Sequence, residues 1–339
     1  MKKSRTTITE IARELNVSPS TVSRALNNHP AISSATREAV IELARKLNYQ
    51  PNLLALNLLR KKTNTIGVIV PEITSYFFSS VINGIQDLLS PLGVNMIIGQ
   101  SNESFEEEKS IIRSFASIRV DGFLISPSSE TNNFDHLQSL IDNNIPLVIF
   151  DRDCEGIDVD KVFVDEYSGA FQAVDHLIKT GCKRIAHIAG SSTLSTSRHR
   201  LNAYKNALKT NNIPVKEEYI VESSGFMPEH GIEPTQKLLN LSEPPDAIFA
   251  INDGVAMGAM FVIKNAGLVI PDQISIIGFD DDPHSAYFRP SLSTVWQPTY
   301  ELGMLSARLL MKRVNSDNNS IKIRVEKLFP ELIVRGSSR

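Results

Sequence analysis

Residues 7–27, TITEIARELNVSPSTVSRALN, carry the pattern that decides the fold of the N-terminal part. Thr7 and Glu10 have the spacing of a capping box, which opens a first short helix. Ser18 can cap a second helix with Pro19 at its first position, after a short turn. This order predicts two helices joined by a tight turn. The apolar residues of the first helix share one face: Ile8, Ile11, Ala12 and Leu15.

A third helix is predicted after Ser33, which can cap it, with an apolar stripe over residues 40–47. Three short helices can share one small core, and two helices with a tight turn match a helix-turn-helix whose second helix enters the major groove of DNA. Ser20 and Arg24 lie four residues apart and project from one face of that helix. Arg24 suits guanine edges or phosphate, whereas Ser20 is a less decisive base reader. The same residues could also be the plain surface of a helical bundle.

The candidate DNA contacts in these helices are of two kinds. Side chains exposed on the second helix can reach base edges, and hydroxyl or N–H groups near helix N-termini can bind phosphate. For the first kind we select Pro19, Ser20, Thr21, Ser23 and Arg24. For the second kind we select Ser18, Ser33 and Thr36.

The net charge of −3 conceals an asymmetry between the two ends of the sequence. Residues 1–62 hold 11 lysines and arginines against 4 acidic residues, a net charge of +7, whereas the remaining residues hold 24 and 34, a net charge of −10. A basic head on an acidic body indicates a polyanion bound at one end. A solvated basic tail would give the same balance, but the helical periodicity of the head argues against a tail.

Two later motifs extend the pattern of the head: Ser-x-x-Thr-Arg at 33–37 and Leu-Asn-Tyr-x-Pro-Asn at 47–52. Together with residues 7–27 they resemble the head of the LacI/GalR family of bacterial regulators. The resemblance implies a hinge helix after Asn52, here residues 53–58. It also implies further DNA contacts, at Thr7, Asn27, Tyr49, Asn52, Ala55 and Leu58.

The expected hinge is bounded by Pro51, which excludes a continuous helix from the preceding element, and by Asn52, which can cap a new one. About eight residues are too few for a stable isolated helix. We therefore expect this segment to fold only when two copies pair on DNA, with Leu58 as a wedge in the minor groove. Leu56 departs from the family, where arginine often follows the alanine. A charged contact can come instead from Arg60, Lys61 and Lys62.

From residue 63 onward, short Ile/Val runs alternate with amphipathic stretches, the rhythm of βαβ units and a parallel sheet. So many runs exceed one small sheet, and a break near residues 151–165 indicates two doubly wound lobes. A ligand is then expected between the lobes, at the carboxyl ends of strands. Strands are predicted at 65–70, 94–99, 122–125, 147–150, 184–188, 247–250 and 274–279, and helices at 79–89, 106–117, 169–180 and 255–266.

Further motifs of the body, among them Phe-Asp-Arg at 150–152, Asn-Asp at 252–253 and Gly-Phe-Asp-Asp at 278–281, resemble the sensor of the same family, which is similar to periplasmic sugar-binding proteins. Carboxylates, guanidinium and amides can hydrogen-bond a polyol while aromatic faces cover its C–H surface. Alanine at 203 replaces the family's usual glycine, and Arg198 lies near Arg200, so either arginine could face the ligand. The resemblance implies these effector-binding residues: Phe77, Asp151, Arg200, Phe226, Asn252, Asp280 and Gln297.

The predicted fold class is therefore an N-terminal all-α helix-turn-helix head plus an α/β, two-lobed sensor like the periplasmic binding proteins, with two doubly wound parallel sheets. We expect the head at 1–48, a hinge and linker at 49–62 and the sensor at 63–339. Lobe one takes about 63–160 plus a returning segment after 297, and lobe two takes about 161–296 plus the C-terminal strand.

Motifs of several enzyme classes are missing from the sequence, including a P-loop, GxGxxG after a strand, GxSxG and HExxH. The histidines show no metal spacing, and His187 falls inside an apolar strand, where a core role is expected. Asp280, Asp281 and Asp282 could be catalytic, but at a strand end they equally fit a ligand clamp. We expect no enzyme, no cofactor and no metal site.

Two cysteines, Cys154 and Cys182, occur without CxxC spacing and are expected to be buried small hydrophobes. No run approaches the roughly 18–20 apolar residues of a membrane helix, and the N-terminus has no apolar signal core. We therefore expect a cytoplasmic protein without a membrane partner.

The sequence thus predicts a sequence-specific DNA-binding transcriptional regulator, a repressor whose operator affinity is set by a small molecule between the sensor lobes. One head reads few base pairs, so a homodimer on pseudo-palindromic double-stranded operator DNA is expected. Only residues 335–339 follow the last expected strand at 328–334, which is too short for a tetramerising helix. We expect dimers.

A sugar or sugar derivative is the first choice of effector, and a nucleobase or nucleoside is the second. A sugar-binding transport protein would share the body, but it should carry a secretory signal in place of a basic helical head. A sugar- or nucleotide-processing enzyme would need a catalytic constellation that the sequence lacks.

Overall fold

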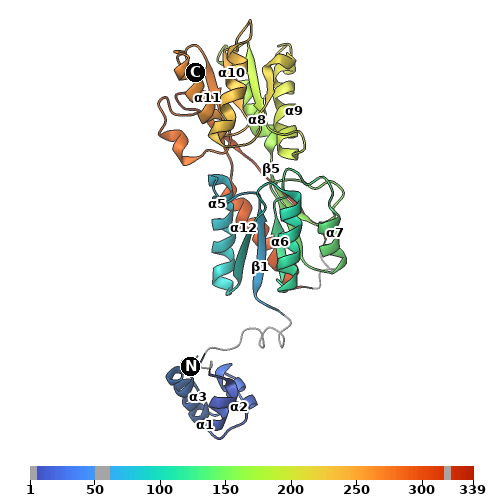
Figure 1. Cartoon of the computed structure of the whole chain (residues 1–339), viewed down its shortest axis with the longest axis vertical. Coiled ribbons are helices and arrows are strands. Elements are labelled where there is room, and N and C mark those ends of the chain that lie inside the picture. The colour runs from blue at the N-terminus through green and yellow to red at the C-terminus, as the bar shows by residue number, and fades with distance from the viewer. Residues whose placement is uncertain (1–5, 50–61, 317–321) are drawn as a thin grey trace. The chain divides into compact units, whose positions relative to one another are not determined.

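The computed structural model describes residues 6–49, 62–316 and 322–339. The chain divides into two compact units, Met1–Thr63 and Asn64–Arg339 (Figure 1). The predicted hinge helix, and with it the expected contacts at Asn52, Ala55 and Leu58, lies outside the described residues.

The first unit contains the helices α1 (Ile8–Glu14), α2 (Pro19–Leu26) and α3 (Ser34–Lys46). Their apolar faces meet in one small core, in which Ile11, Val22 and Val40 are fully buried. The turn between α1 and α2 passes through Asn16, whose φ of 49° is one that asparagine tolerates better than most residues. Helix, turn and helix therefore follow one another as predicted.

Each helix of this unit starts at a side-chain cap. The Glu10 N–H donates to Thr7 Oγ1 (3.3 Å) while the Thr7 N–H donates to Glu10 Oε2 (2.9 Å), a complete capping box. Ser18 and Ser33 accept from the N–H groups three residues on, at 3.1 and 3.2 Å. Caps satisfy N–H groups that have no partner within a helix, so they fix where a helix begins. The three predicted caps are confirmed.

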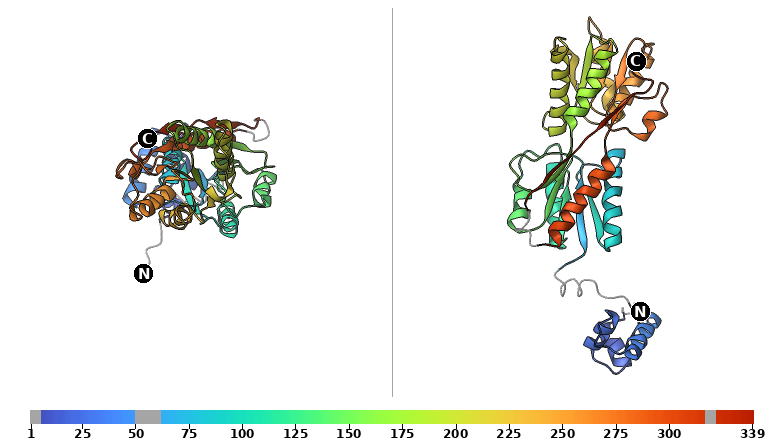
Figure 2. Two further views of the ribbon diagram at one scale, coloured as in Figure 1. Left: turned by 90° about the horizontal axis from the view of Figure 1, so that it is seen from above. Right: turned by 180° about the vertical axis from the view of Figure 1, so that it is seen from behind.

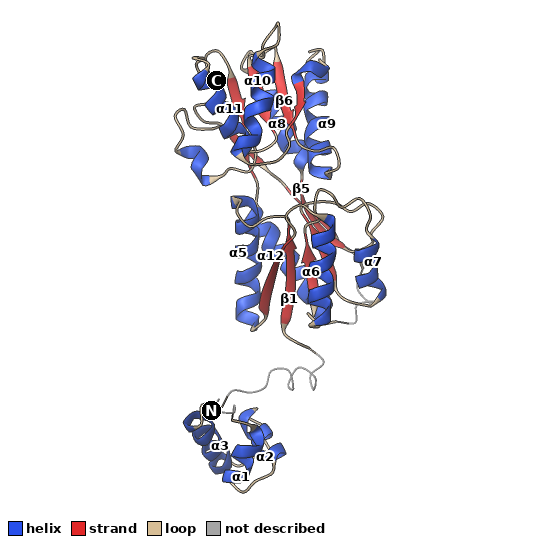
Figure 3. Ribbon diagram, viewed as in Figure 1, coloured by secondary structure: helices blue, strands red, loops and turns tan. Residues whose placement is uncertain are grey.

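Lobe one of the second unit is built on a parallel sheet with strand order β11-β5-β4-β3-β1-β2. Helices α5 and α12 share one apolar core with one face of this sheet, and α6 and α7 share a second core with the other face (Figure 3). The elements are β1 (Thr65–Val70), α5 (Tyr76–Leu89), the 3-10 turn η1 (Ser90–Leu92), β2 (Asn95–Gln100), α6 (Phe105–Ser117), β3 (Gly122–Ile125), α7 (Asp135–Asp142), β4 (Leu147–Phe150), β5 (Asp160–Val164), α12 (Thr299–Val314) and β11 (Val325–Leu328).

Lobe two repeats the plan with a parallel sheet of order β7-β6-β8-β9, covered by α8 and α9 on one face and by α10 and α11 on the other. An antiparallel pair, β10 with β12, completes it. Two parallel sheets with helices on both faces confirm the predicted fold class. The elements are α8 (Glu166–Lys179), β6 (Ile185–Ala189), α9 (Ser195–Thr210), η2 (Glu217–Tyr219), β7 (Ile220–Glu222), η3 (Pro228–Gly231), α10 (Ile232–Leu239), β8 (Ala247–Ala250), α11 (Asp253–Asn265), β9 (Ser275–Ile277), η4 (Pro283–Ala286), β10 (Thr294–Trp296) and β12 (Glu331–Ile333).

The chain passes between the lobes after β5, after β10 and after β11, and the last two passages run together at the back of the unit (Figure 2). The stretch 151–165, expected as a break, contains β5, which pairs with β4 and β11 in lobe one. The passage therefore follows Val164, later than the expected boundary near 160. The single strand expected at 328–334 is wrong. Pro330 has no N–H for a ladder, and the chain changes lobe there between β11 and β12.

Helices α5 and α12 pack backbone against backbone. A Cβ atom on Gly84 of α5 would lie 2.1 Å from the Tyr300 carbonyl oxygen, and one on Gly303 of α12 would lie 2.0 Å from the Val81 carbonyl oxygen. No side chain can be placed at either position without separating the helices. The contact fixes the returning helix α12 against the helix that carries Phe77.

Candidate functional site

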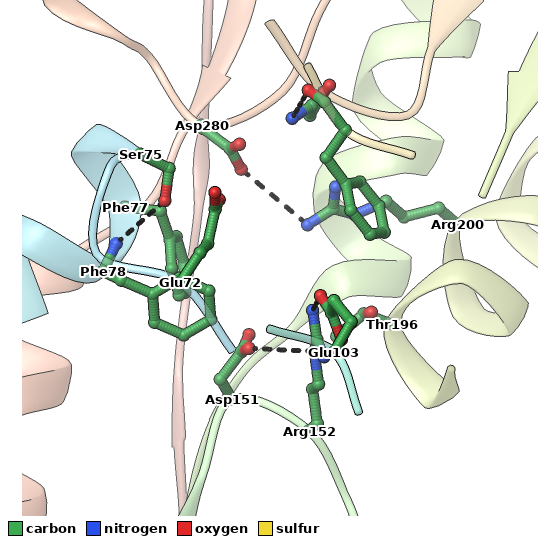
Figure 4. Close-up of a pocket in the computed structure, with 12 residues that line it drawn as sticks. Glu72, Ser75, Phe77, Phe78, Glu103, Asp151, Arg152, Thr196, Arg200 and Asp280 are labelled. Carbon is green, nitrogen blue, oxygen red and sulfur yellow. Dashed lines mark hydrogen bonds and ion pairs between the residues drawn. The ribbon is translucent and has the colours of Figure 1, made fainter. Parts of the chain in front are cut away.

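A cleft between the two lobes forms at the carboxyl ends of the parallel strands. Asp151 directly follows β4 of lobe one, while Asn252 and Asp280 come shortly after β8 and β9 of lobe two. Strands that run in parallel end at one edge of their sheet, so each lobe presents these loops to the cleft. The lining residues are Glu72, Ser75, Phe77, Phe78, Glu103, Asp151, Arg152, Thr196, Arg200, Phe226, Asn252 and Asp280 (Figure 4).

The structure brings six of the seven predicted effector residues into this lining. Gln297, the seventh, is 1% exposed and lies behind Asp280, to which its Nε2–H donates a 2.7 Å hydrogen bond. Its position was expected at the cleft surface. In the structure, Gln297 instead holds the carboxyl group of Asp280, which lines the cleft.

Arg200 enters the cleft from α9 and is held on several sides. Its Nε–H donates to Glu166 Oε2 (2.6 Å), one Nη donates to the Ile251 carbonyl, and its guanidinium carbon lies 3.7 Å from the centroid of the Phe279 ring. A second Nη lies 4.0 Å from Asp280 Oδ1. These contacts fix the plane of the guanidinium and point one of its edges toward Asp280 (Figure 4).

Arg198, the other candidate, has a different role. Its Nη1 donates to the carbonyl groups of Ser192 and Thr193 at 3.1 and 2.7 Å, and its Nη2 lies 3.5 Å from Glu155. It lines a separate hollow beside the cleft. Of the two arginines on α9, Arg200 is therefore the one that lines the cleft with Asp280.

Burial of carboxyl groups dominates the electrostatics of the cleft. Desolvation raises the pKa of Asp151 to about 6, although the neighbouring Arg152 opposes this shift. The same cause raises the pKa of Asp280 well above its ordinary value, against the pull of Arg200. Behind it, desolvation raises the pKa of Asp253 to about 7, even though Thr294 donates to this carboxylate (2.6 Å). Near neutral pH these groups can therefore offer both proton donors and acceptors.

Two aromatic rings, Phe77 from α5 and Phe226 from the loop before α10, complete the lining. Asn252 ties the second ring in place. Its Oδ1 accepts from the Val255 N–H (2.9 Å) as the cap of α11, and its Nδ2 donates to the Phe226 carbonyl (3.0 Å). The amide thus positions Phe226 as well as lining the cleft.

The lining also contains residues that the sequence did not indicate. Glu72 and Glu103 follow β1 and β2, so their positions after strands were a usable signal, and Arg152 belongs to the Phe-Asp-Arg motif itself. The loop that presents Glu103 has positive φ at both Asn102 and Glu103, a conformation that sequence reasoning does not foresee. The residues that sequence reasoning missed are Glu72, Ser75, Phe78, Glu103, Arg152 and Thr196.

In the first unit, the described residues among the predicted DNA contacts lie on α2, at the helix caps and after α3. Ser20 and Arg24 of α2 are exposed, as predicted, and the Ser18 hydroxyl bridges to those of Ser20 and Thr21 at 2.7 and 2.8 Å. The remaining members are exposed or half-buried: Thr7, Pro19, Ser23, Asn27, Ser33, Thr36 and Tyr49.

Comparison with known proteins gives this geometry its context. Residues 7–52 match the model of "Bacterial regulatory proteins, lacI family", and residues 174–338 match that of a "Periplasmic binding protein-like domain". Catabolite control protein A of Priestia megaterium is 34% identical over 312 residues, covering 92% of this chain and 93% of the relative. The chain belongs to the lacI family.

Solved structures of lacI-family regulators have the same fold. The Lac repressor dimer bound to operator and the anti-inducer ONPF superimposes with a TM-score of 0.87 at 25% identity, covering 98% of this chain and 99% of that one. The transcriptional regulator CelR in complex with cellobiose has a TM-score of 0.75 at 28% identity, covering 98% and 100%. This lacI-family protein is therefore a DNA-binding transcriptional repressor whose second unit binds a controlling small molecule.

Two further residues bear on the question of enzyme activity. His187 is fully buried, stacks on Phe249 with ring centroids 4.9 Å apart and hydrogen-bonds the carbonyl of that residue (2.9 Å). Burial lowers its pKa to about 4, which fits a neutral core histidine. Asp281 pairs with Arg335 (2.7 Å), a structural contact. The relatives are regulators, in agreement with a role other than catalysis.

Within the described ranges, no helix has the length and hydropathy to cross a membrane.

Proposed function

We propose that this chain is a homodimeric, cytoplasmic repressor that binds a pseudo-palindromic operator and responds to a sugar or sugar derivative held between its sensor lobes. The observation that carries the proposal is the composition of the cleft. Carboxyl groups of Asp151 and Asp280, the guanidinium of Arg200 and the rings of Phe77 and Phe226 surround one hollow. Such a set can hydrogen-bond several hydroxyl groups and cover the C–H face of a pyranose or furanose.

The proposed DNA-reading surface is the exposed side of α2, with Ser20 and Arg24 as base-reading candidates and the capped starts of α2 and α3 as phosphate-binding sites. Two copies are needed because one such helix reads only a few base pairs. The sensor units then hold the dimer, and each pair of heads meets the two halves of one operator.

Control of operator affinity is proposed to act through closure of the lobes. Direct contacts already cross the cleft: the Asp153 N–H of lobe one donates to Ser195 Oγ at the start of α9 (3.0 Å). A ligand that binds the closed form more tightly shifts the population toward it, and a shift from mostly open to mostly closed needs about 5 kcal/mol of preference. Closure changes the spacing of the two linkers in the dimer and so the fit of the paired heads to DNA.

The proposal is tested with Asp280→Ala in the full-length chain. Operator affinity is measured by gel shift with and without the ligand found in a thermal-shift screen of sugars, sugar phosphates and nucleosides. The variant should bind the operator as tightly as the parent and lose the ligand effect. Asp142→Ala, on the exposed side of α7, is the matched control and should retain both. Loss of operator binding in Asp280→Ala would contradict the separation of the two sites.

A nucleobase or nucleoside is the second candidate ligand, favoured by one observation. Phe77 and Phe226 can cover the two faces of a flat ring, and the Asn252 amide lies beside them. The same thermal-shift screen separates the two classes. A transport-protein function is separated by the gel shift, because only phosphate contacts give an affinity that falls steeply with salt.

A further inference from the structure

The two arginines of the cleft are already neutralised by carboxylates of the protein itself. Arg152 makes a bidentate pair with Glu103, at 2.7 Å for Nη1 to Oε2 and 2.8 Å for Nη2 to Oε1, and its Nη1 also donates to the Pro127 carbonyl (2.8 Å). Arg200 is paired with Glu166 (2.6 Å). Each guanidinium and its carboxylate partner form a pair with little net charge, so the pair attracts a ligand anion only weakly.

Glu103 is itself built into position. Its Oε2 accepts a second hydrogen bond, from the Ser129 N–H (2.7 Å). The carbonyl of Pro127, two residues before Ser129, accepts from Arg152, so the same loop contacts both members of the pair. The Arg152 guanidinium and this backbone N–H hold the pKa of Glu103 below its ordinary value against the effect of burial, so the group is ionised at neutral pH. The pair is therefore held by several hydrogen bonds within lobe one.

After these two pairs are set aside, the charges that remain at the described lining are carboxyl groups. Glu72 accepts only from the Thr74 hydroxyl (2.9 Å), and Asp151 and Asp280 complete the set. A connected hollow that shares Glu72 and Asp280 adds Asp253, Asp282 and His284, and the imidazole of His284 lies 2.7 Å from Asp282. Arg152 is shared between two of these groups, because its Nε also lies 3.6 Å from Asp151 Oδ2. Among the described lining residues, two guanidinium groups therefore face four carboxyl groups.

We propose that the cleft accepts a hydroxyl-rich ligand without an anionic group, rejects its phosphorylated and uronate counterparts, and that Glu103 determines this selectivity by occupying Arg152. This inference rests on the proposed function and deepens it. A ligand anion would meet this excess of carboxyl groups, and both described arginines of the lining already have carboxylate partners, so binding of the anion is opposed by like-charge repulsion. A neutral polyol instead finds hydrogen-bonding partners in the carboxyl groups of Asp151 and Asp280.

The first test uses the full-length parent chain and matched probes that differ in charge: glucose, glucose 6-phosphate and glucuronate; galactose, galactose 6-phosphate and galacturonate; ribose and ribose 5-phosphate; cytidine and cytidine 5′-monophosphate. Dissociation constants are measured by calorimetry. In the set that binds, the neutral member should bind about 100-fold more tightly than the anionic member. A tightest binder that carries phosphate or carboxylate overturns the inference while leaving the regulator function standing. If no probe binds, the proposed sugar or nucleoside function fails, and the inference fails with it.

The second test assigns the selectivity to Glu103. Glu103→Gln removes the carboxylate that pairs with Arg152, so the ratio of the anionic member's affinity to the neutral member's affinity should rise about tenfold. Glu106→Gln, an identical change at an exposed position on α6, is the control and should leave the ratio unchanged. Adding Arg152→Gln to Glu103→Gln should cancel the rise. A Glu103→Gln protein that still unfolds cooperatively and shows no rise in this ratio refutes the role of Glu103.

Discussion

Gln297 donates a hydrogen bond from Nε2 to Oδ1 of Asp280 across 2.7 Å, and it does so from the segment that leads back into lobe one. Asp280 itself sits at a φ of 111°, a conformation that costs energy for a residue other than glycine and needs support from its surroundings. The hydrogen bond thus joins the cleft carboxyl group of lobe two to one of the passages between the lobes.

Gln297→Ala should therefore weaken ligand binding although Gln297 does not line the cleft. Loss of a buried hydrogen bond to a carboxyl group costs about 1–3 kcal/mol, which corresponds to a loss of affinity of about 5- to 150-fold if it falls on ligand binding. Calorimetry with the ligand from the thermal-shift screen measures this loss. Gln138→Ala, an amide on α7 away from the cleft, is the control. Unchanged affinity in Gln297→Ala would show that Asp280 is held without it.

Arg200→Lys should abolish most ligand binding even though the charge is kept. Lysine has no planar guanidinium, so it cannot lie over the Phe279 ring and reach Glu166 and the Ile251 carbonyl together. We expect a loss of about 100-fold in affinity and a lower melting temperature. Arg198→Lys is the matched control two residues away and should change ligand affinity by less than about threefold. Equal effects of the two substitutions would remove the distinction drawn between these arginines.

Stability should depend on pH through Asp253, which is fully buried with a pKa raised to about 7. Between the ordinary carboxyl pKa near 4 and pH 7, the folded state holds a proton that the unfolded state has released, so this group's contribution to stability falls as pH rises through that window. Asp253→Asn removes the titration. The free energy of unfolding, measured by chemical denaturation, should fall from pH 5 to pH 8 in the parent. In the variant this fall should be smaller by on the order of 1–3 kcal/mol. His187, with a pKa lowered to about 4, acts in the opposite direction and is common to both proteins. Identical differences between pH 5 and pH 8 in parent and variant would contradict the assignment.

Arg24→Ala should weaken operator binding by about 10- to 100-fold, because an arginine on the recognition helix contributes roughly 1–3 kcal/mol whether it reads a base or a phosphate. The two roles differ in the salt dependence of the gel shift: loss of a phosphate contact lowers the slope of log affinity against log salt by about one. Arg13→Ala, an exposed arginine on α1, is the control. An Arg24→Ala protein with the parent's affinity would exclude this face of α2 from the DNA contact.

The sequence predicted those parts of the fold that local chemistry determines. The helices of the head begin at the expected caps, and β3, β4 and β8 have the predicted bounds because each is a continuous apolar run buried on both faces. Strands at the edges of a sheet were harder. β11, Val-Glu-Lys-Leu, is half polar and gains its partner β5 only when distant parts of the chain meet, so no local pattern marks it.

The same division applies to the cleft. Residues that directly follow strands, such as Asp151 and Asn252, could be predicted together because parallel strands deliver their ends to one place. Glu103 and Arg152 could not be paired from sequence, since they are 49 positions apart and meet through a loop with left-handed backbone angles. Gln297 was predicted to line the cleft, but it is buried behind the lining residue Asp280. The depth of a side chain below the cleft surface depends on packing that the sequence pattern does not encode.

The glycine contacts between α5 and α12 have a mechanical consequence. At Gly84 and Gly303 the backbones of the two helices touch, so at these two points no side chain separates them. Gln297 stands just before α12, and Phe77 lies in the first turn of α5. The passage beside Asp280 is therefore linked to the Phe77 side of the cleft through a direct backbone contact between the two helices.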